Sequence, residues 1–376
     1  MDRTMKPPAE IGMEVIDIDT PALIIDLDRF ESNLDLMSRE VARLGVSLRP
    51  HAKTHKSADV AKAQLLRGAV GVCCQKVSEA EALANNGVNN ILITNQIVGR
   101  HKIDRLVELS RNAEVSVCVD NSENIADLND AASSANLILN VLVEIDVGGG
   151  RCGAPPGQPT VDLACEISNA SHLIFSGLQA YNGQAQELRC YLERRQAIEN
   201  VCNTVNNTIG LLKENGLYCE LITGSGTGTW EFEGASQVYT EIQAGSYVFM
   251  DASYLKNEDV NGQMGTAFKS SLYIYTMIMS INSKNYAVVD AGLKSIAFDQ
   301  GMPVVVNNSD ANYYEPSDEH GLIGLDKSAI RYAVGDKIML VPGHCDPTVN
   351  LHNWYVCIRN DRVEQIWDVT GRGALY

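Results

Sequence analysis

The sequence predicts an α/β protein: a (β/α)8 TIM-like barrel followed by a C-terminal β domain. Short apolar runs alternate with amphipathic stretches over roughly the first 250 residues, in about eight β–α units. No GxGxxG motif opens the first helix, which favours a barrel over a doubly wound sheet. After about Asp251, short alternating runs separated by Gly, Asn and Asp replace the helical period, which is typical of a β domain.

The expected barrel strands are mostly apolar throughout, as strands covered on both faces are. They are Ala22–Leu27, Val46–Arg49, Gly71–Cys74, Ile91–Asn95, Val115–Val119, Asn140–Ile145, Phe175–Ala180, Glu220–Thr223 and Ile242–Phe249. The amphipathic stretches between them predict helices over Arg29–Leu44, Ser57–Arg67, Ser78–Asn85, His101–Arg111 and Ser122–Ala132. A cap at Asp120-Asn121-Ser122 is expected to open the last of these.

The C-terminal region alternates with a period of two, as half-buried strands do. Its expected strands are Ser271–Ser280, Tyr286–Asp290, Lys337–Val341, Trp354–Arg359 and Val363–Trp367. We therefore expect a barrel domain over residues 20–255 and a β domain over 256–376. Residues 1–19 are expected to add to the β domain near Ile16–Ile18. With no low-complexity linker, the two domains should pack closely.

Composition limits the function. The 376 residues are 45% hydrophobic and carry a formal net charge of −17, which argues against nucleic acid and anionic membranes as partners. No apolar run of about 20 residues predicts a membrane span, and the N-terminus resembles no secretory signal. The ten cysteines are scattered through apolar segments without a paired framework, which predicts reduced thiols in a cytoplasmic protein.

Polar residues follow many of the expected strands. In a parallel barrel, such strand-end loops build the active site on the C-terminal face. Contact with solvent would explain a polar residue at any single strand end, but not so many in succession. The residues are Asp28, Lys53, Gln75, Asn95-Gln96, Asp120-Asn121, Arg151, Tyr181-Asn182, Ser225-Gly226-Thr227 and Gly245-Ser246.

Lys53 lies in the segment Arg-Pro-His-Ala-Lys-Thr-His-Lys, directly after an expected strand. An amine at a strand mouth suits an aldehyde cofactor such as pyridoxal phosphate, provided that its pKa is lowered by burial and nearby cations. Arg49, His51 and His55 would supply those cations. The alternative is a solvated lysine in a basic loop.

Two further segments carry ligand chemistry. The run 221–229, rich in Gly, Ser and Thr, and the run Gln243–Tyr247 could bind a phosphate through backbone amides and hydroxyls, or could be flexible turns. In His344-Cys345-Asp346, alternate residues of an extended segment share a face, so imidazole and carboxylate could bind Mg, Mn or Zn. A β-turn begun by Asp346-Pro347 is the alternative.

Taken together, five motifs resemble one family. They are the segment around Lys53, residues 71–80 (GVCCQKVSEA), residues 289–294 (VDAGLK), residues 318–321 (DEHG) and residues 343–348 (GHCDPT). The chain is similar from about Asp19 onward to the D-threonine aldolase and 3-hydroxy-D-aspartate aldolase family. These are alanine racemase-like, fold-type III pyridoxal phosphate enzymes.

The resemblance implies a role for each matching residue. Lys53 would carry the cofactor covalently, and Arg151 and Tyr181 would lie against its ring. A divalent metal, Mg or Mn ahead of Zn, would bind His344 and Asp346. The family also implies a head-to-tail homodimer, in which the β domain of one subunit closes the other's site. The residues that would contact the cofactor, chiefly its phosphate, are Gln75, Thr227, Gly245, Ser246 and Tyr254.

The chain departs from the family at one position. After Tyr181, relatives resemble Tyr-x-Gly-x-x-Gln-His, whereas this chain has Glu187 in place of the histidine. Either Glu187 or another group, such as His320, would take over the role of that histidine. The candidate catalytic residues are therefore Lys53, His51 and Glu187.

The implied reaction is retro-aldol cleavage of a D-3-hydroxy amino acid to glycine and an aldehyde. The substrate could be D-threonine, D-allo-threonine or 3-hydroxy-D-aspartate. One alternative is a D-serine or D-threo-3-hydroxyaspartate dehydratase on the same scaffold, but such relatives resemble a His-x-Cys metal site, and Asp346 favours the aldolase. The other is a non-catalytic pyridoxal phosphate-binding protein, which would need neither the β domain nor the metal motif.

Overall fold

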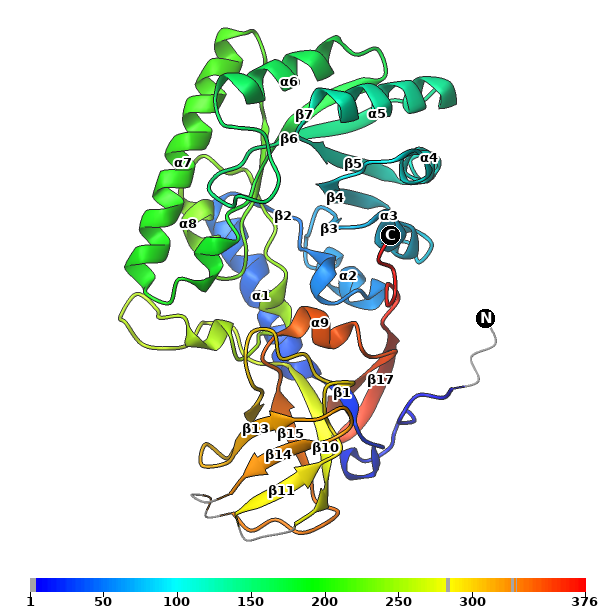
Figure 1. Cartoon of the computed structure of the whole chain (residues 1–376), viewed down its shortest axis with the longest axis vertical. Coiled ribbons are helices and arrows are strands. Elements are labelled where there is room, and N and C mark those ends of the chain that lie inside the picture. The colour runs from blue at the N-terminus through cyan, green and yellow to red at the C-terminus, as the bar shows by residue number, and fades with distance from the viewer. Residues whose placement is uncertain (1–4, 282–284, 326–327, 329) are drawn as a thin grey trace.

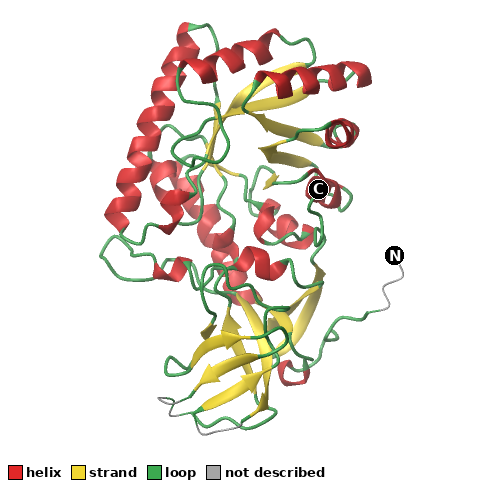
Figure 2. Ribbon diagram, viewed as in Figure 1, coloured by secondary structure: helices red, strands yellow, loops and turns green. Residues whose placement is uncertain are grey.

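The computed structural model describes residues 5–281, 285–325, 328 and 330–376. In the orientation of Figure 1 an α/β barrel occupies the upper part and a β unit the lower part, with helix α1 (Leu27–Leu44) running from one into the other. Figure 2 shows helices surrounding the barrel strands, whereas the lower unit is built mainly of strands. The predicted fold class is confirmed.

The barrel has eight parallel strands in the order β2-β9-β8-β7-β6-β5-β4-β3. The amide of Cys73 donates to the carbonyl of Pro50 at 2.9 Å, so β3 returns to β2 and the ring closes. The strands are β2 (Ser47–Leu48), β3 (Val72–Cys74), β4 (Asn90–Gln96), β5 (Glu114–Val119), β6 (Leu139–Glu144), β7 (Leu173–Ala180), β8 (Leu221–Gly224) and β9 (Glu241–Ile242).

Helices follow most of these strands and cover the outside of the barrel (Figure 2). They are α2 (Ala58–Leu65), α3 (Val77–Ala84), α4 (Arg100–Leu109), α5 (Ser122–Ala135), α6 (Gln158–Asn169), α7 (Tyr191–Glu214) and α8 (Trp230–Ala235). The predicted cap of α5 is confirmed, because the Asn121 side chain accepts the amide of Asn124 at 2.9 Å. None of the helices in the described part of the chain combines the length and apolar character that crossing a bilayer requires.

The lower unit is one nine-stranded sheet in the order β11-β14-β13-β12-β15-β10-β1-β16-β17. Because β11 also pairs with β10, strands β10 to β15 close on themselves. The strands are β1 (Ala22–Asp26), β10 (Leu272–Ser280), β11 (Tyr286–Val289), β12 (Val304–Val305), β13 (Asn312–Pro316), β14 (Gly321–Gly324), β15 (Lys337–Val341), β16 (Trp354–Arg359) and β17 (Arg362–Asp368). A short helix, α9 (Cys345–Val349), connects β15 to β16.

The position of β1 corrects the sequence analysis, which counted Ala22–Leu27 among the barrel strands. Instead Ala22 pairs with Tyr275 of β10, and Ile24 pairs with Val356 of β16. An apolar strand followed by a helix has the same pattern in either sheet, so the sequence could not distinguish them. The barrel is complete without β1, and the division into domains at residue 255 stays a prediction.

Two other elements differ from expectation. The predicted strand Ile242–Phe249 is a strand only up to Ile242, and a 3-10 helix, η4 (Ser246–Val248), follows after Gly245. Strands β12, β13 and β14 were not predicted, because they are short and interrupted by Asn, Gly and Pro. Lys337 Nζ of β15 donates to the carbonyls of Ile16 and Ile18, and the assignment of residues 1–19 to the β domain stays a prediction.

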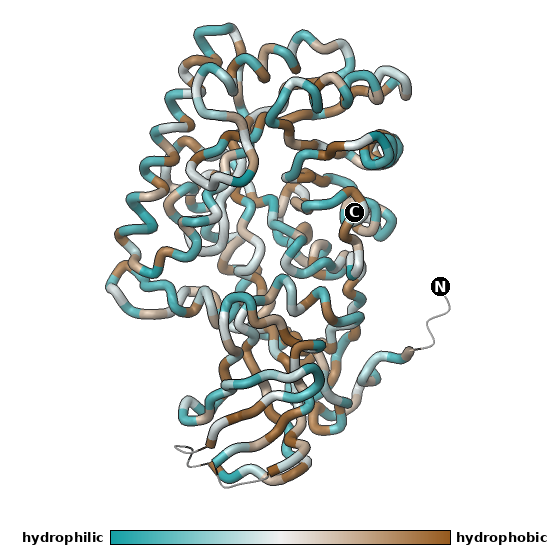
Figure 3. The backbone as a smooth tube through the Cα atoms, in the orientation of Figure 1, coloured by the Kyte–Doolittle hydropathy of each residue, from teal (hydrophilic) through white to brown (hydrophobic). Residues whose placement is uncertain are grey.

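The barrel strands are buried on both faces. Cys73, Leu92, Cys118 and Leu142 form a cluster of their own, separate from the main core, and these residues come from four neighbouring strands. Alternate residues of the same strands belong to the main core that the helices cover: Val72, Ile91, Val117 and Val141. In Figure 3 hydrophobic residues concentrate on the strands, whereas the helices alternate between hydrophobic and hydrophilic residues.

Helix α1 joins the barrel to the β unit. Its N-cap Asp26 accepts the amide of Arg29 at 3.0 Å, and Gly45, with φ of 72°, ends it in the left-handed conformation. Phe30 on its buried face lies 6.4 Å from Phe249 of the barrel and 5.6 Å from Trp367 of β17, measured between ring centroids. Phe30 therefore packs against both units at once.

We expect Phe30→Ala to lower the free energy of unfolding by about 3–5 kcal/mol, because the fully buried ring would leave a cavity between the units. Phe30→Leu is the matched control and should cost less than half as much. Chemical denaturation followed by circular dichroism measures both. Equal effects of the two substitutions would show that this packing does not hold the units together.

Candidate active site

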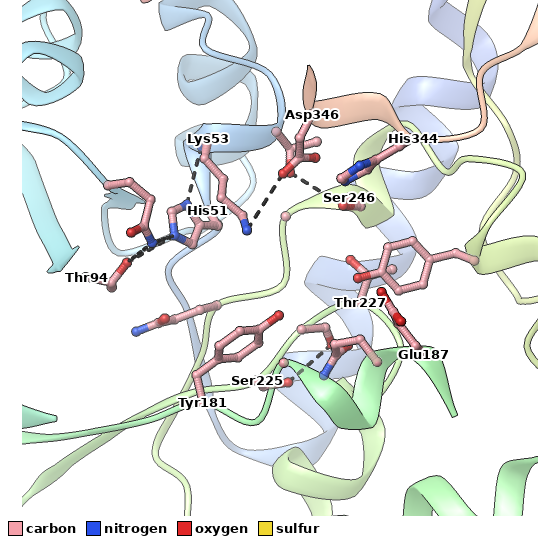
Figure 4. A pocket seen from close by; sticks show the side chains of 18 of the residues that line it. His51, Lys53, Thr94, Tyr181, Glu187, Ser225, Thr227, Ser246, His344 and Asp346 are labelled. Atoms are coloured by element: carbon pink, nitrogen blue, oxygen red, sulfur yellow. Dashed lines mark hydrogen bonds and ion pairs between the residues drawn. The ribbon is translucent and has the colours of Figure 1, made fainter. Parts of the chain in front are cut away.

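A cavity of about 250 Å³ lies at the mouth of the barrel, between the strand-end loops and α9 of the β unit. Figure 4 shows that side chains from both units line it. Twelve residues proposed from the sequence for catalysis, cofactor or metal line this one cavity: His51, Lys53, Gln75, Arg151, Tyr181, Glu187, Thr227, Gly245, Ser246, Tyr254, His344 and Asp346.

Lys53 lies on the 3-10 helix η2 (Ala52–Thr54), which starts four residues after β2. Its Nζ is 3.8 Å from Asp346 Oδ2 (Figure 4). Burial has the largest single effect and lowers the pKa of Lys53, but the acidic neighbours together, Asp346 first among them, raise this pKa above its usual value of 10.5. The expectation of an amine with a lowered pKa among cations is therefore wrong for this structure. The nearest opposing charge belongs to the predicted metal ligand.

Arg49, one of the cations expected beside Lys53, instead lies below the cavity. Its Nε is 3.0 Å from the carboxylate of Glu241. Thr223 donates to the same carboxylate at 2.7 Å, and Gln243 donates to Thr223 at 2.7 Å and to Gln179 at 2.7 Å. These residues form a buried polar network under the cavity, whose upper members Gln179 and Gln243 also line it.

The sequence analysis missed Gln179 as a lining residue, and it named Gln243 only as part of a candidate phosphate-binding run. Gln179 falls inside an apolar strand, and Gln243 directly follows β9. A glutamine flanked by buried apolar residues on a barrel strand was the available signal, because such a side chain faces the interior and must find partners there.

His51 is buried at one side of the cavity. Its Nε2 lies 3.0 Å from Thr94 Oγ1 and 2.9 Å from Gln75 Nε2, and its Nδ1 accepts the amide of Lys53. Burial, and then the positive charge of Lys53, lowers the pKa of His51 well below 6.5, so the ring is neutral near pH 7. His51 thus fixes the start of the lysine helix, together with Thr94, which the sequence analysis also missed.

Two glycine-containing loops, 224–229 and 245–246, follow the last two barrel strands. Within the described chain no acceptor is bonded to the backbone N–H of Gly226, Thr227, Gly245 or Ser246. A Cβ on Gly226 would lie 2.5 Å from Gln186 Oε1, and one on Gly245 would lie 2.7 Å from the carbonyl oxygen of His51. Free amides and closely packed glycines on two adjoining loops fit the phosphate of pyridoxal phosphate.

The first of these loops is held by the segment that precedes α7. Gln186 accepts the amide of Gly228 at 2.8 Å and donates to Thr229 Oγ1 at 2.8 Å. The buried guanidinium of Arg194 donates to the carbonyls of Gly228, Leu188, Arg189 and Glu258, at 3.0, 2.9, 2.8 and 2.6 Å. The loop 224–229, which we call the phosphate loop after the group that it fits, and the segment carrying Glu187 are therefore fixed to each other.

Arg151 and Tyr181 lie on the loops after β6 and β7. The Arg151 guanidinium is 6.0 Å from the centroid of the Tyr181 ring. In Figure 4 Tyr181 lies across the cavity from Asp346, on the side of Ser225. A flat aromatic ring entering between Lys53 and the phosphate loop would meet this side of the cavity, which fits the pyridine ring of the cofactor.

The segment of His344 and Asp346 is not extended, contrary to the sequence analysis. His344 is the N-cap of α9, and Asp346 lies in its first turn. The Pro347 that follows belongs to the same first turn, where proline is tolerated because the amide has no partner. The side chains of His344 and Asp346 still both line the cavity. The first turn of a helix therefore places the two side chains on the same side, as an extended segment was expected to do.

Asp346 and His344 fit a divalent metal. Asp346 Oδ1 is buried with no hydrogen-bond partner, and His344 Nδ1 is 2.6 Å from Asp299 Oδ2, which leaves Nε2 as the ligand atom. No group of three or more His, Cys, Asp or Glu side chains with metal-binding geometry occurs among the described residues. The protein would therefore supply two ligands, and water or substrate oxygens the rest.

A buried carboxylate holds α9 at the barrel mouth. Asp251 Oδ1 accepts the amide of Tyr254 at 3.0 Å, and Oδ2 accepts the amide of Cys345 at 3.2 Å. The backbone adds two bonds, because the amides of Ala252 and Ser253 donate to the carbonyls of Pro342 and Gly343. The segment after the last barrel strand thus fixes the metal motif relative to Lys53.

Glu187 lies at the end of the 3-10 helix η3 (Gln184–Glu187), exposed at the cavity wall. In Figure 4 it lies on the side of His344, away from His51. No hydrogen bond or ion pair joins its carboxylate to any residue in the described ranges. His320, the other candidate for the role of the missing histidine, is exposed and does not line the cavity.

Comparison with known proteins places the chain in a family. The family model described as alanine racemase, N-terminal domain, matches residues 25–253, and a putative serine dehydratase domain matches residues 271–358. A 3-hydroxy-D-aspartate aldolase of Paracoccus denitrificans (strain Pd 1222) is 44% identical, over 98% of this chain and 96% of the relative. A D-threonine aldolase of Arthrobacter sp. is 42% identical, over 98% and 97%.

The chain belongs to the D-threonine aldolase and 3-hydroxy-D-aspartate aldolase family. The crystal structure of a D-threonine aldolase from Filomicrobium marinum superimposes with a TM-score of 0.96 at 43% identity, covering 99% of this chain and 100% of that one. A D-threo-3-hydroxyaspartate dehydratase of Delftia sp. is more distant, at 26% identity. As a member of this aldolase family, the protein is a carbon–carbon lyase.

Behind the phosphate loop of this aldolase lies a buried carboxyl group with a shifted pKa. Glu233 on α8 accepts the Thr229 hydroxyl at 2.8 Å, and its Oε2 has no partner. Burial raises the pKa of Glu233 from 4.5 to about 8. The folded state keeps this proton to a higher pH than the unfolded state, so the free energy of unfolding falls as pH rises between 4.5 and about 8.

We expect Glu233→Gln to remove this part of the pH dependence. Below about pH 4 the two proteins should show a constant difference in stability, because Glu233 is protonated in both the folded and the unfolded state. By about pH 8.5 the wild type should have lost on the order of 3 kcal/mol relative to the variant. Denaturant unfolding at pH steps across this range measures the difference, and parallel curves for the two proteins would contradict the shifted pKa.

Proposed function

We propose that the protein is a pyridoxal phosphate- and divalent metal-dependent aldolase that cleaves D-3-hydroxy amino acids to glycine and an aldehyde. The observation that carries the proposal is the position of Lys53 and the His344–Asp346 pair in one cavity, with 3.8 Å between Lys53 Nζ and Asp346 Oδ2. Covalent cofactor chemistry and hydroxyl activation could therefore act on adjacent atoms of one small substrate. The named activities of the relatives support the same reaction.

Lys53 would hold the cofactor, with the two glycine loops at its phosphate and Arg151 and Tyr181 beside its ring. When bound, pyridoxal phosphate takes up the electron pair released at Cα. The amine of Lys53, which lies beside Asp346, would be placed to hold a proton and deliver it to Cα. The neutral ring of His51 holds the lysine helix and takes no proton near pH 7.

Asp346 and His344 Nε2 would bind Mg or Mn, with Asp299 orienting the imidazole. When bound, such a metal lowers the pKa of the substrate β-hydroxyl, so that its proton can leave near neutral pH. The lysine and the metal ligands are fixed relative to each other by Asp251. Only one configuration at Cα then brings the β-hydroxyl to the metal ligands, which accounts for selection of the D-enantiomer.

We further propose that the enzyme works as a homodimer in the cytoplasm, with a small D-3-hydroxy amino acid as its only partner molecule in catalysis. All ten cysteines are free, which fits a reducing compartment.

A dehydratase is the second candidate, because the second family model is described as a putative serine dehydratase domain. Dehydratase chemistry releases ammonia and a keto acid and leaves Cα–Cβ intact. Asp346, at the position where dehydratases resemble His-x-Cys, favours the aldolase. A non-catalytic cofactor-binding protein is not supported, since the β unit contributes His344, Asp346 and Gln300 to the cavity.

The deciding experiment compares metal-stripped enzyme with enzyme restored with Mg²⁺ or Mn²⁺, each incubated with D-threonine and with 3-hydroxy-D-aspartate. We expect glycine in amounts equal to the aldehyde, and at least a hundredfold more of it when metal is present. Chromatography of derivatised amino acids quantifies glycine, and a coupled assay quantifies ammonia. Ammonia and a keto acid without glycine would overturn the aldolase in favour of the dehydratase.

Asp346→Asn should reduce kcat at least a hundredfold, because the amide loses the negative charge that would bind the metal. The absorbance of the bound cofactor should persist, since Lys53 is intact. The exposed Asp310→Asn is the matched control and should behave as the wild type. Full activity of Asp346→Asn with unchanged metal dependence would remove Asp346 from the metal site.

A further inference from the structure

We propose that Glu187 selects the substrate by charge. Its carboxylate disfavours D-3-hydroxy amino acids with an anionic β-substituent, so the enzyme cleaves D-threonine in preference to 3-hydroxy-D-aspartate. This inference rests on the proposed aldolase function. To that function it adds the kind of substituent on the substrate Cβ that the cavity accepts.

Two fixed points determine where that substituent lies. Lys53 and the phosphate loops place the substrate amine and Cα, and the metal pair places the β-hydroxyl. The remaining group on Cβ must then lie on the His344 side of the cavity. Ser253 lines the cavity, and it lies on the His344 side because its amide donates to the carbonyl of Gly343, the residue before His344, at 3.2 Å. Gln300 lines it too, next in sequence to Asp299, which binds His344.

Glu187 is the charged residue in this part of the cavity that is not committed to another group. Figure 4 shows it on the His344 side. Glu187 has no ion pair or hydrogen bond within the described ranges, whereas Asp346 lies beside Lys53. A second carboxylate placed here, on the β-carbon of the substrate, would therefore meet a negative charge that no side chain of the described residues neutralises.

No cation of the described chain offsets that charge at this position. The lysine and arginine side chains that line the cavity are Lys53 and Arg151, and Arg151 lies over Tyr181 on the loop after β6. Arg189 is near, but its guanidinium donates to the carbonyl and hydroxyl of Ser253 and to Asn257 Oδ1. It does not line the cavity.

The backbone on both sides of Glu187 is also held in place. The preceding residue, Gln186, is bonded to Gly228 and Thr229, and Arg189 two residues later is bonded to Ser253 and Asn257. The backbone around Glu187 cannot move away from the cavity without breaking these contacts. A backbone shift therefore cannot carry the Glu187 carboxylate out of the cavity.

The test is the ratio of kcat/KM for D-threonine to kcat/KM for 3-hydroxy-D-aspartate, in wild type, Glu187→Gln and Glu187→Arg. We expect a ratio well above one in the wild type and a fall of about tenfold with each unit of charge removed or reversed. Because Glu187 is exposed to solvent, 0.5 M NaCl should reduce the wild-type ratio by screening. Glu193→Gln, an exposed carboxylate on α7 outside the cavity, is the control and should leave the ratio unchanged.

A binding measurement separates charge selection from chemistry. D-Aspartate and D-2-aminobutyrate lack the β-hydroxyl and cannot be cleaved, so their dissociation constants follow from the absorbance change of the bound cofactor. Wild type should bind D-aspartate at least tenfold more weakly than D-2-aminobutyrate, and Glu187→Arg should reverse the order.

The outcomes are distinct. A wild-type preference for 3-hydroxy-D-aspartate, or an equal loss of both activities in Glu187→Gln with an unchanged ratio, would overturn charge selection and leave the aldolase intact. Ammonia in place of glycine from both substrates would overturn the proposed function. In that case the order of the two dissociation constants would still decide the role of Glu187.

Discussion

The buried carboxylate of Asp251 is the interaction on which the site depends. Its two oxygens accept the amides of Tyr254 in the barrel's last segment and Cys345 in α9, and so join the barrel side of the cavity to the side that carries His344 and Asp346. Neither unit has a complete site alone, because the barrel lacks the His344–Asp346 pair and the β unit lacks Lys53. A buried acceptor that satisfies one donor from each unit is stable only when both donors are in place.

Much of the site could be predicted from the sequence because barrel geometry collects strand-end residues on one face. Lys53, Gln75, Arg151, Tyr181 and Thr227 come from five different strand ends, and they meet in one cavity. Gln179 was missed because a polar residue inside a strand gives no sign of which interior partner it has. The contact between His344 and Asp299 was likewise invisible, because it joins residues 45 positions apart in irregular segments.

An element of the fold was predictable where its hydrophobic periodicity and the residues at its two ends agree. It was not predictable where two different structures share one sequence pattern. Helix α1 has both a capping aspartate and a terminal glycine, so its extent was foreseen closely. The strand before it carries only an apolar run, and such a run fits either sheet. Arg49 was expected beside Lys53 only because it is charged and close in sequence. Which way the side chain turns is set by Glu241, which lies 192 residues later.

The placement of β1 in the C-terminal sheet has a consequence for synthesis. Residue 22 leaves the ribosome early, yet its partners are Tyr275 and, for Ile24, Val356. At roughly 5–20 residues per second, this strand remains without its neighbours for on the order of 10–60 s of translation. Over that interval the barrel can form while β1 stays an unpaired apolar edge, the kind of segment that chaperones bind and that aggregates when they are scarce. The earliest strand of the chain is therefore among the last to reach its final neighbours.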